Sequence, residues 1–296
     1  MAEKDDARSV DFDIIREPEE IRTESSRRHT TPVLTWILAV VFIAAAAAAA
    51  YIAFRGPGET KPASTGVDHA LPPGTPANLG GASMPVVVPP LDQSDPVVRE
   101  LVRQLTSHPQ VAAWLATDGL IRNFTVVMAN TADGATPARH LRTLRPSAAF
   151  SVDMTAGGIV LDPRSYRRYD AIASAAGSVD ARGAARIYAT LKPRIAEAYK
   201  DLGHPDTPVD QALERAIVAL LETPVVQGPI HLHPVKGTNY AFDDPRLESL
   251  TDAQKQLLRT GPDNMRLIQG AFRSIALALG IPESHLPAPR TVVQTH

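Results

Sequence analysis

The chain has no cysteine among its 296 residues. This absence excludes disulfide bonds, a thiol nucleophile, cysteine-based zinc sites and an anchor attached through a lipidated cysteine. Aromatic residues make up only 5% of the chain, whereas alanine and proline are abundant. This composition favours an alanine-rich helical domain in which prolines mark the starts of helices.

The chain also lacks a large excess of charge of either sign. The formal net charge is −2 and the isoelectric point is about 6.5. Residues 91–280 carry 21 basic and 20 acidic side chains, and residues 1–32 carry 6 and 9. There is therefore no bulk electrostatic case for nucleic acid, and we expect no nucleic-acid partner.

The usual catalytic signatures are missing as well. The chain contains no GxSxG elbow, SxxK motif, P-loop or HExxH motif. His231 and His233 are two residues apart on an expected strand, a spacing that can ligate a metal, but the polar face of a hairpin explains them better. We therefore predict no catalytic residue, no metal site and no cofactor.

One long apolar run stands out near the N-terminus. Residues 33–54 read VLTWILAVVFIAAAAAAAYIAF and contain no charged residue, glycine or proline. A helix of this length spans about 33 Å, which matches a bilayer core of about 30 Å. The run predicts a single transmembrane helix and the lipid bilayer as a partner. Two alternatives are a cleaved signal peptide and a twin-arginine signal at Arg27-Arg28, but the segment before the run is long and polar.

The flanking charges predict the orientation of this helix. Four arginines lie shortly before it, whereas only Arg55 and Lys61 follow it closely. Positive charge gathers on the cytoplasmic side, so residues 1–32 are expected to be a disordered cytoplasmic tail. Residues 55–90 are expected to be a linker, because 14 of residues 56–90 are glycine or proline. Residues 91–281 would form the helical domain, and residues 282–296 a disordered tail.

Helix starts in the expected domain are marked by a capping residue followed by proline. They occur at Asp95-Pro96, Thr136-Pro137, Asp162-Pro163, Thr207-Pro208, Asp244-Pro245 and Gly261-Pro262. Thr251 with Gln254, and Thr207 with Asp210, resemble capping boxes. Apolar residues recur at helical spacing over 97–105, 120–128, 187–195, 213–221 and 265–279. Pro193 should lie within a helix over about 180–202.

Two segments alternate as strands do. Residues 150–161 turn at Gly157-Gly158, and residues 230–242 turn at Lys236-Gly237. The predicted fold class is mainly α: a single-pass transmembrane helix plus a helical soluble domain with one or two small β-hairpins.

Two polar clusters are candidates for recognition. The first is basic and contains Arg139, His140, Arg142 and Arg145, a pattern that also fits a solvated helix face. The second is the segment 162–170, DPRSYRRYD, in which Tyr166 and Tyr169 share a helical face and Arg167 can pair with Asp170. Tyrosine and arginine are favoured contact residues, although the tyrosines could also pack inward.

Several stretches together resemble a known bacterial family. They are PPLDQSD at 89–95, WLATDGLI at 114–121, DPRSYRRYD at 162–170, ETPVV at 222–226 and QKQLLRTGP at 254–262. The chain resembles the domain-of-unknown-function family numbered 3014, found in membrane-anchored envelope proteins. The resemblance supports the predicted layout but implies no activity.

The segments 162–170 and 254–262 match the family pattern best. The candidate binding surface therefore consists of Tyr166, Arg168, Tyr169, Asp170, Lys255 and Arg259. The leading hypothesis is a membrane-tethered binding or scaffolding module in the periplasm, anchored in the bacterial inner membrane, whose partner is an envelope protein or polymer. The alternative is an extracytoplasmic enzyme acting on an envelope polymer or an anionic small molecule, which would need these residues to line one concave site.

Overall fold

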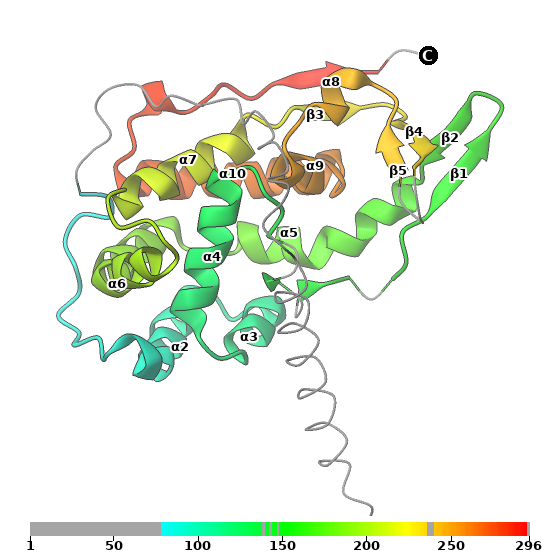
Figure 1. The fold of residues 1–296 in the computed structure, drawn as a ribbon. Coiled ribbons are helices and arrows are strands. Elements are labelled where there is room, and N and C mark those ends of the chain that lie inside the picture. The colour runs from blue at the N-terminus through cyan, green and yellow to red at the C-terminus, as the bar shows by residue number, and fades with distance from the viewer. Residues whose placement is uncertain (1–77, 138–139, 142–143, 147, 236–239, 295–296) are drawn as a thin grey trace, which may run out of the picture. The chain divides into compact units, whose positions relative to one another are not determined.

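The computed structural model describes residues 78–294 except 138–139, 142–143, 147 and 236–239 (Figure 1). The predicted tail, transmembrane helix and most of the predicted linker lie outside these residues. Within the described part of the chain, no helix is both long enough and apolar enough to cross a bilayer.

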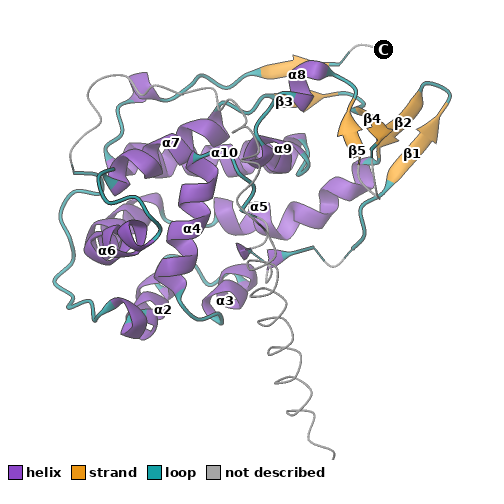
Figure 2. Ribbon diagram, in the orientation of Figure 1, coloured by secondary structure: helices purple, strands orange, loops and turns teal. Residues whose placement is uncertain are grey.

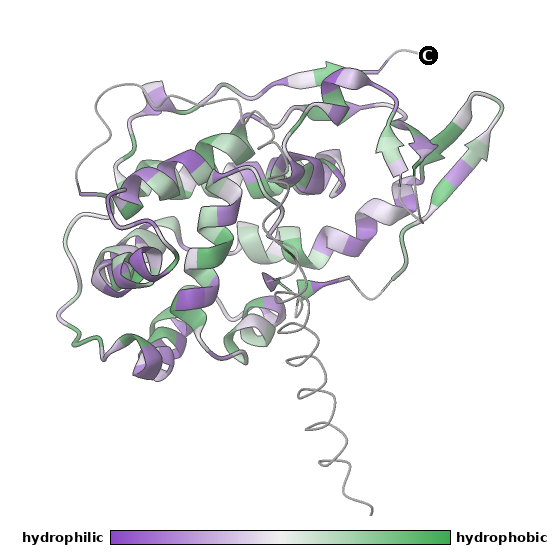
Figure 3. Cartoon of the chain, in the orientation of Figure 1, coloured by the Kyte–Doolittle hydropathy of each residue, from purple (hydrophilic) through white to green (hydrophobic). Residues whose placement is uncertain are grey.

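The described domain is mainly helical, with a small sheet at one side (Figure 2). Its α-helices are α2 (Asp95–Arg103), α3 (Pro109–Leu115), α4 (Leu120–Ala132), α5 (Asp170–Gly177), α6 (Ala181–Asp201), α7 (Val209–Leu221), α8 (Pro245–Glu248), α9 (Asp252–Leu258) and α10 (Pro262–Leu279). The 3-10 helices are η1 (Leu91–Gln93), η4 (Pro163–Tyr169) and η5 (Glu283–His285). The helices carry both apolar and polar residues, as amphipathic helices do (Figure 3).

Several predicted helix starts are confirmed. The carboxylates of Asp162 and Asp244 accept hydrogen bonds from the backbone amides two residues later, those of Arg164 and Arg246, at the starts of η4 and α8. Thr251 and Gln254 form the predicted capping box of α9. Pro193 lies inside α6 as predicted.

Two predicted caps differ in the structure. Asp95 does not cap its own helix, because its carboxylate binds the backbone amides at the start of α4 instead. At Thr207-Pro208 no side-chain cap forms, and the carboxylate of Asp210 is buried in other contacts. In both cases the aspartate carboxylate binds groups that are distant in the sequence instead of the first amides of its own helix.

The two predicted hairpins are confirmed and join into one sheet. The strands β1 (Val152–Thr155) and β2 (Gly158–Leu161) form the first hairpin, and β4 (His231–Pro234) and β5 (Tyr240–Phe242) form the second. Antiparallel pairing of β2 with β4 joins them in the order β1-β2-β4-β5. The predicted turn at Lys236-Gly237 lies outside the described residues.

A second, two-stranded sheet was not predicted. The strand β3 (Val225–Gln227) pairs in parallel with β6 (Thr291–Val293). Residues 282–294, predicted as part of a disordered tail, therefore form η5 and β6, and Leu286 among them is buried.

The start of the domain also differs from the prediction. Residues 78–90, placed in the linker by their composition, pack against the helices. Leu79 is 0% exposed, its amide donates to Asp210, and the amide of Gly80 donates to the carbonyl of Leu279. The amide of Met84 donates to Thr190. Hydrogen bonds from its backbone amides hold this segment on the domain. Such bonds do not require a periodic pattern of apolar residues, so the pattern of the sequence did not reveal them.

Buried apolar residues form two clusters. The helical cluster contains residues of α2, α4, α6, α7 and α10, together with Leu79. The mixed cluster contains residues of the sheets, α5, α8, α9 and the first half of α10, including Leu161, Val226, Phe242 and Met265. Phe272 of α10 packs against both clusters.

Candidate functional site

The segment 162–170 is fixed at its start by Asp162. This carboxylate accepts hydrogen bonds from the Ser151 hydroxyl at 2.7 Å and from the Arg164 backbone amide and guanidinium. Burial opposes ionisation of Asp162, but these hydrogen bonds outweigh it and hold its pKa below the ordinary value. Asp162 therefore attaches η4 to the first hairpin, which is a structural role.

Tyr166 is packed against the start of α10. Gly261 precedes that helix with φ of +86°, and a Cβ atom built at Gly261 would overlap the Tyr166 ring. Burial raises the pKa of the Tyr166 hydroxyl to about 12. The two segments that match the family pattern thus touch each other, and a glycine makes this contact possible.

Polar contacts reinforce this packing. The side-chain amide of Asn264 donates to the Asp170 carboxylate at 2.9 Å and to the Tyr166 carbonyl at 3.0 Å. The side-chain amide of Gln256 donates to the Tyr169 hydroxyl at 3.3 Å. We call the contact between segments 162–170 and 254–264 the junction. Asp170 is bound there by Asn264, and no ion pair with Arg167 is formed.

Arg168 lies between two aromatic rings. Its guanidinium carbon is 5.4 Å from the centre of the Phe150 ring and 5.1 Å from that of Tyr169. Its Nε donates to the Ser165 carbonyl at 2.8 Å. No described carboxylate lies within 4 Å of its guanidinium. The side chain is thus positioned by packing and one hydrogen bond, and its charge is not neutralised by a neighbour.

Unlike Arg168, Lys255 forms an ion pair within the domain. Its ammonium lies 2.9 Å from the Glu248 carboxylate and also donates to the Glu248 carbonyl. Burial opposes ionisation of Glu248, but hydrogen bonds from the Phe242 amide and from Lys255 hold its pKa below the ordinary value. Lys255 therefore links α9 to α8 and β5.

Arg259 directly follows α9, and its guanidinium lies over the Phe242 ring of β5. Its guanidinium carbon is 5.6 Å from the centre of the Phe242 ring, and among the described residues it has no carboxylate within 4 Å. Phe150 also contacts Tyr240 of β5, with ring centres 5.9 Å apart. Arg168 and Arg259 therefore lie at two ends of a group of aromatic side chains around β5.

The structure brings together the two segments that sequence reasoning selected, but it divides their side chains. Tyr166, Tyr169 and Asp170 face α9 and α10 at the junction. Lys255 and Arg259 contact α8 and β5. The six residues pack in helix and sheet contacts, and none of them lines the surface hollows around α2 and α3.

The other sequence candidates are only partly described. Arg139 and Arg142 of the basic stretch lie outside the described residues. On β4, the Nδ1 atom of His233 lies 2.6 Å from the Asp243 carboxylate. The described residues include no group of three or more side chains that could hold a metal ion.

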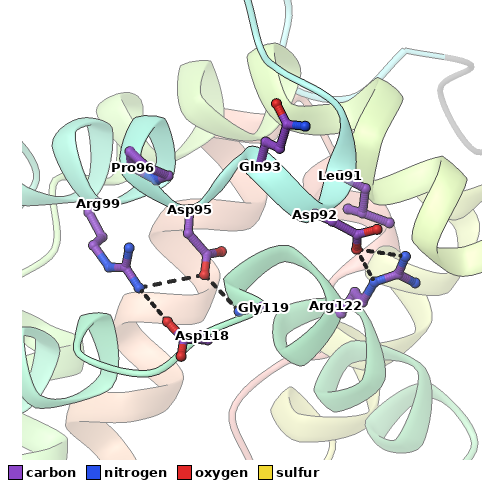
Figure 4. A pocket seen from close by; sticks show the side chains of 9 residues that line it. All are labelled: Leu91, Asp92, Gln93, Asp95, Pro96, Arg99, Asp118, Gly119 and Arg122. Carbon is purple, nitrogen blue, oxygen red and sulfur yellow. Dashed lines mark hydrogen bonds and ion pairs between the residues drawn. The ribbon is translucent and has the colours of Figure 1, made fainter.

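Sequence reasoning missed a hollow of about 510 Å³ at the α2–α4 corner (Figure 4). There Arg99 donates to the carbonyls of Leu115 and Thr117, at the end of α3. Asp95 accepts from the amides of Gly119 and Leu120, at the start of α4. The spacing of Asp95 and Arg99 suggests a surface ion pair on α2, and only the fold reveals that both support the α3–α4 turn.

A second group in this hollow is also structural. Arg122 of α4 lies 3.1 Å from Asp92 and 2.8 Å from Asp201 at the end of α6. The hydrogen bonds that the Arg122 guanidinium donates to Asp201 and Asp92 raise its pKa. The charged side chains of the hollow thus join helix ends, and we assign it no ligand.

Comparison with known proteins gives one match. A model of the family described as "Protein of unknown function (DUF3014)" matches residues 120–276, more than half of the chain. No curated protein and no solved structure matches. The chain therefore belongs to this family, and the matched region contains the whole junction.

Proposed function

We propose that this member of the DUF3014 family is a membrane-tethered binding module of the bacterial envelope. Residues 33–54 would span the inner membrane with residues 1–32 in the cytoplasm. The part of the chain that precedes residue 78 would connect this anchor to a periplasmic domain. The apolar run and its flanking arginines support this layout.

One observation carries the binding role. At the junction most polar side chains already have internal partners, whereas the guanidinium groups of Arg168 and Arg259 are held on aromatic rings with no described carboxylate within 4 Å. Glu248 acts on Arg259 only through the longer-range field of its charge, because its carboxylate is paired with Lys255. Arginine held in this way keeps donors free for a partner and loses little rotamer freedom on binding. This arrangement suits recognition better than catalysis, because the candidate residues pack together and do not converge on a concave site.

The role can be tested in cells with the full-length protein. Chemical crosslinking followed by purification in detergent should recover a partner with the wild-type chain and lose it with the double variant Arg168→Ala/Arg259→Ala. Arg182→Ala is the matched control, because Arg182 is an exposed arginine on another helix. If wild type and double variant recover the same molecules in the same amounts, the binding role of this surface is refuted.

The layout has its own test. A reporter that is active only outside the cytoplasm, fused after His296, should be active in the full chain. Activity from a cytoplasmic reporter alone at that position would reverse the proposed orientation. An N-terminus near Tyr51 in the mature protein would show that the apolar run is a cleaved signal.

A further inference from the structure

Carboxylates on the elements around Arg168 and Arg259 have partners of their own. Glu248, whose charge reaches Arg259 at longer range, is paired with Lys255 at 2.9 Å. Other described carboxylates on these elements are bound to side chains other than the two arginines: Asp162 to Ser151 and Arg164, Asp170 to Asn264, Asp243 to His233, and Asp252 to Lys255. The charge of the two guanidinium groups is therefore not balanced by a described carboxylate within 4 Å.

Both guanidinium groups also have hydrogen-bond donors to spare. At Arg168 the Nε atom donates to the Ser165 carbonyl at 2.8 Å, and no described residue accepts from the two Nη atoms. No described residue accepts from the Arg259 guanidinium. Two parallel Nη–H donors match the two oxygens of one carboxylate, so each arginine can hold such a group in a bidentate contact.

Aromatic rings lie between the two arginines. The centre of the Phe150 ring is 5.4 Å from the guanidinium carbon of Arg168 and 5.9 Å from the centre of the Tyr240 ring. Tyr240 and Phe242 are two residues apart on β5, so their side chains lie on one face of the sheet, and Arg259 lies over Phe242. We call these five residues the arginine–aromatic cluster.

We infer that the arginine–aromatic cluster binds carboxylates of an acidic segment in a partner protein. Each guanidinium would receive an aspartate or glutamate of that segment, and an apolar residue of the segment would contact Phe150, which is 37% exposed. This inference rests on the proposed binding function and specifies the chemistry of the partner.

The packing of Arg168 distinguishes a protein carboxylate from other anions. The rings of Phe150 and Tyr169 flank its guanidinium, so an anion reaches the Nη atoms along the guanidinium plane. A planar carboxylate fits this approach, whereas a tetrahedral phosphate carries oxygens out of the plane toward the rings. A sugar polymer would stack on a ring face, but Phe150 already has Arg168 over its face and Tyr240 against it.

Fluorescence anisotropy with the full-length protein in detergent at low ionic strength tests the inference. The probe is a labelled synthetic peptide with two pairs of glutamates separated by leucines. We expect Arg168→Gln and Arg259→Gln each to bind it at least about tenfold more weakly than wild type, because each removes a charge-assisted bidentate contact. The matched control Arg182→Gln, which changes an exposed arginine of α6, should bind within about threefold of wild type.

Two further measurements test the contact itself. A peptide with glutamine in place of each glutamate leaves the protein unaltered, and equal binding of the two peptides would overturn the inference. Arg168→Lys keeps the charge but loses the planar fork, so it should bind the acidic peptide at least about threefold more weakly. Binding of this variant equal to that of wild type would refute a bidentate carboxylate at Arg168.

Competition identifies the source of the anion. At equal concentrations of negative charge, unlabelled acidic peptide should displace the probe more effectively than polyphosphate or polygalacturonate does. Equal or better displacement by polyphosphate would overturn the choice of carboxylate over phosphate. Equal or better displacement by polygalacturonate would overturn the choice of a protein over a glycan.

The outcomes separate this inference from the proposed function. If the acidic peptide fails to bind while the crosslinked partner still depends on Arg168 and Arg259, the carboxylate inference is refuted and the binding role stands. If neither the peptide nor the crosslinked partner depends on these arginines, both proposals fail.

Discussion

The helical cluster and the mixed cluster bury apolar residues in different ways. In the helical cluster, regular stripes on α4, α6 and α7 supply most contacts, and their spacing is visible in the sequence. In the mixed cluster, short segments far apart in the chain meet, such as β2, β5 and the start of α10. Where regular elements are short, single glycines and buried polar groups must fix the geometry.

The largest expected effect tests this dependence in the mixed cluster. Gly261→Ala should destabilise the domain by about 4 kcal/mol, because alanine is strained at φ of +86° and its Cβ would overlap Tyr166. Thermal melting of the full chain in detergent should show a decrease of roughly 10 °C.

Gly270→Ala, within the helix that Gly261 precedes, is the matched control. Gly270 is exposed, and no atom lies near a Cβ built there. Alanine should leave the free energy of unfolding unchanged or raise it by up to about 1 kcal/mol, because alanine has the higher helix propensity. Tm should therefore not fall. Equal melting of both variants would show that the Tyr166–Gly261 contact does not hold the mixed cluster together.

The second effect concerns the helical cluster, where one buried carboxylate joins the start of the domain to α6. Asp210 accepts from the Tyr188 hydroxyl at 2.6 Å, from Lys192 at 2.8 Å and from the Leu79 amide at 3.2 Å. Asp210→Ala leaves the Tyr188 hydroxyl and the Leu79 amide without this acceptor and removes the carboxylate partner of Lys192, which keeps its hydrogen bonds to Asn78 and the Leu79 carbonyl. The substitution should cost about 3 kcal/mol.

Hydrogen exchange of residues 78–84 provides the readout for this variant. Exchange should rise there first, because these residues lose their link to α7. Asp206→Ala, at an exposed site in the loop that precedes α7, should change neither Tm nor exchange. Unchanged protection of residues 78–84 in Asp210→Ala would mean that other contacts hold this segment.

Sequence patterns predicted the local features of both clusters. The capping box at Thr251 and Gln254, the cap at Asp162 and both hairpins follow from a few neighbouring residues, and each is confirmed. Such features depend on hydrogen bonds and side-chain alternation within about ten residues of chain.

Features that depend on distant partners were not predictable. The strands β3 and β6 are three residues each and pair across more than sixty residues. Residues 78–90 read as linker because backbone groups, which no composition reveals, attach them to α7 and α10. In the candidate site, the sequence selected both segments of the junction but could not show that Asn264 binds Asp170 or that Arg168 lies on Phe150.

Acid should weaken the mixed cluster. Hydrogen bonds donated by Arg246 and, to a smaller extent, by Gln294 lower the pKa of Asp244. The pKa values of Asp162 and Glu248 are also lowered. A carboxyl group with a lowered folded-state pKa stabilises the fold fully above its unfolded value of about 4, and this stabilisation disappears as the pH falls through the folded-state pKa. Tm should therefore fall below about pH 4.

Hydrogen exchange can locate this acid effect. At pH values below about 4, amides of β1, β2, β4 and β5 should lose protection before those of α6 and α7. In Asp244→Asn, Tm should fall less steeply below about pH 4 than in the wild type, because the asparagine amide does not titrate. A simultaneous loss of protection in both clusters would show that they unfold as one unit.

The smallest expected loss of stability concerns Arg168, which lies at the surface of the mixed cluster and is proposed to bind the partner. Its guanidinium stacks on Phe150 and Tyr169 at the surface of the mixed cluster. Arg168→Ala should cost only about 0.5–1 kcal/mol, the usual value of a partly exposed cation–π contact. Arg259→Ala should cost a similar amount through loss of its contact with Phe242. If both variants melt within about 3 °C of wild type yet lose the crosslinked partner, the arginines serve recognition. A much larger decrease in Tm for either would instead make that arginine part of what holds the mixed cluster together.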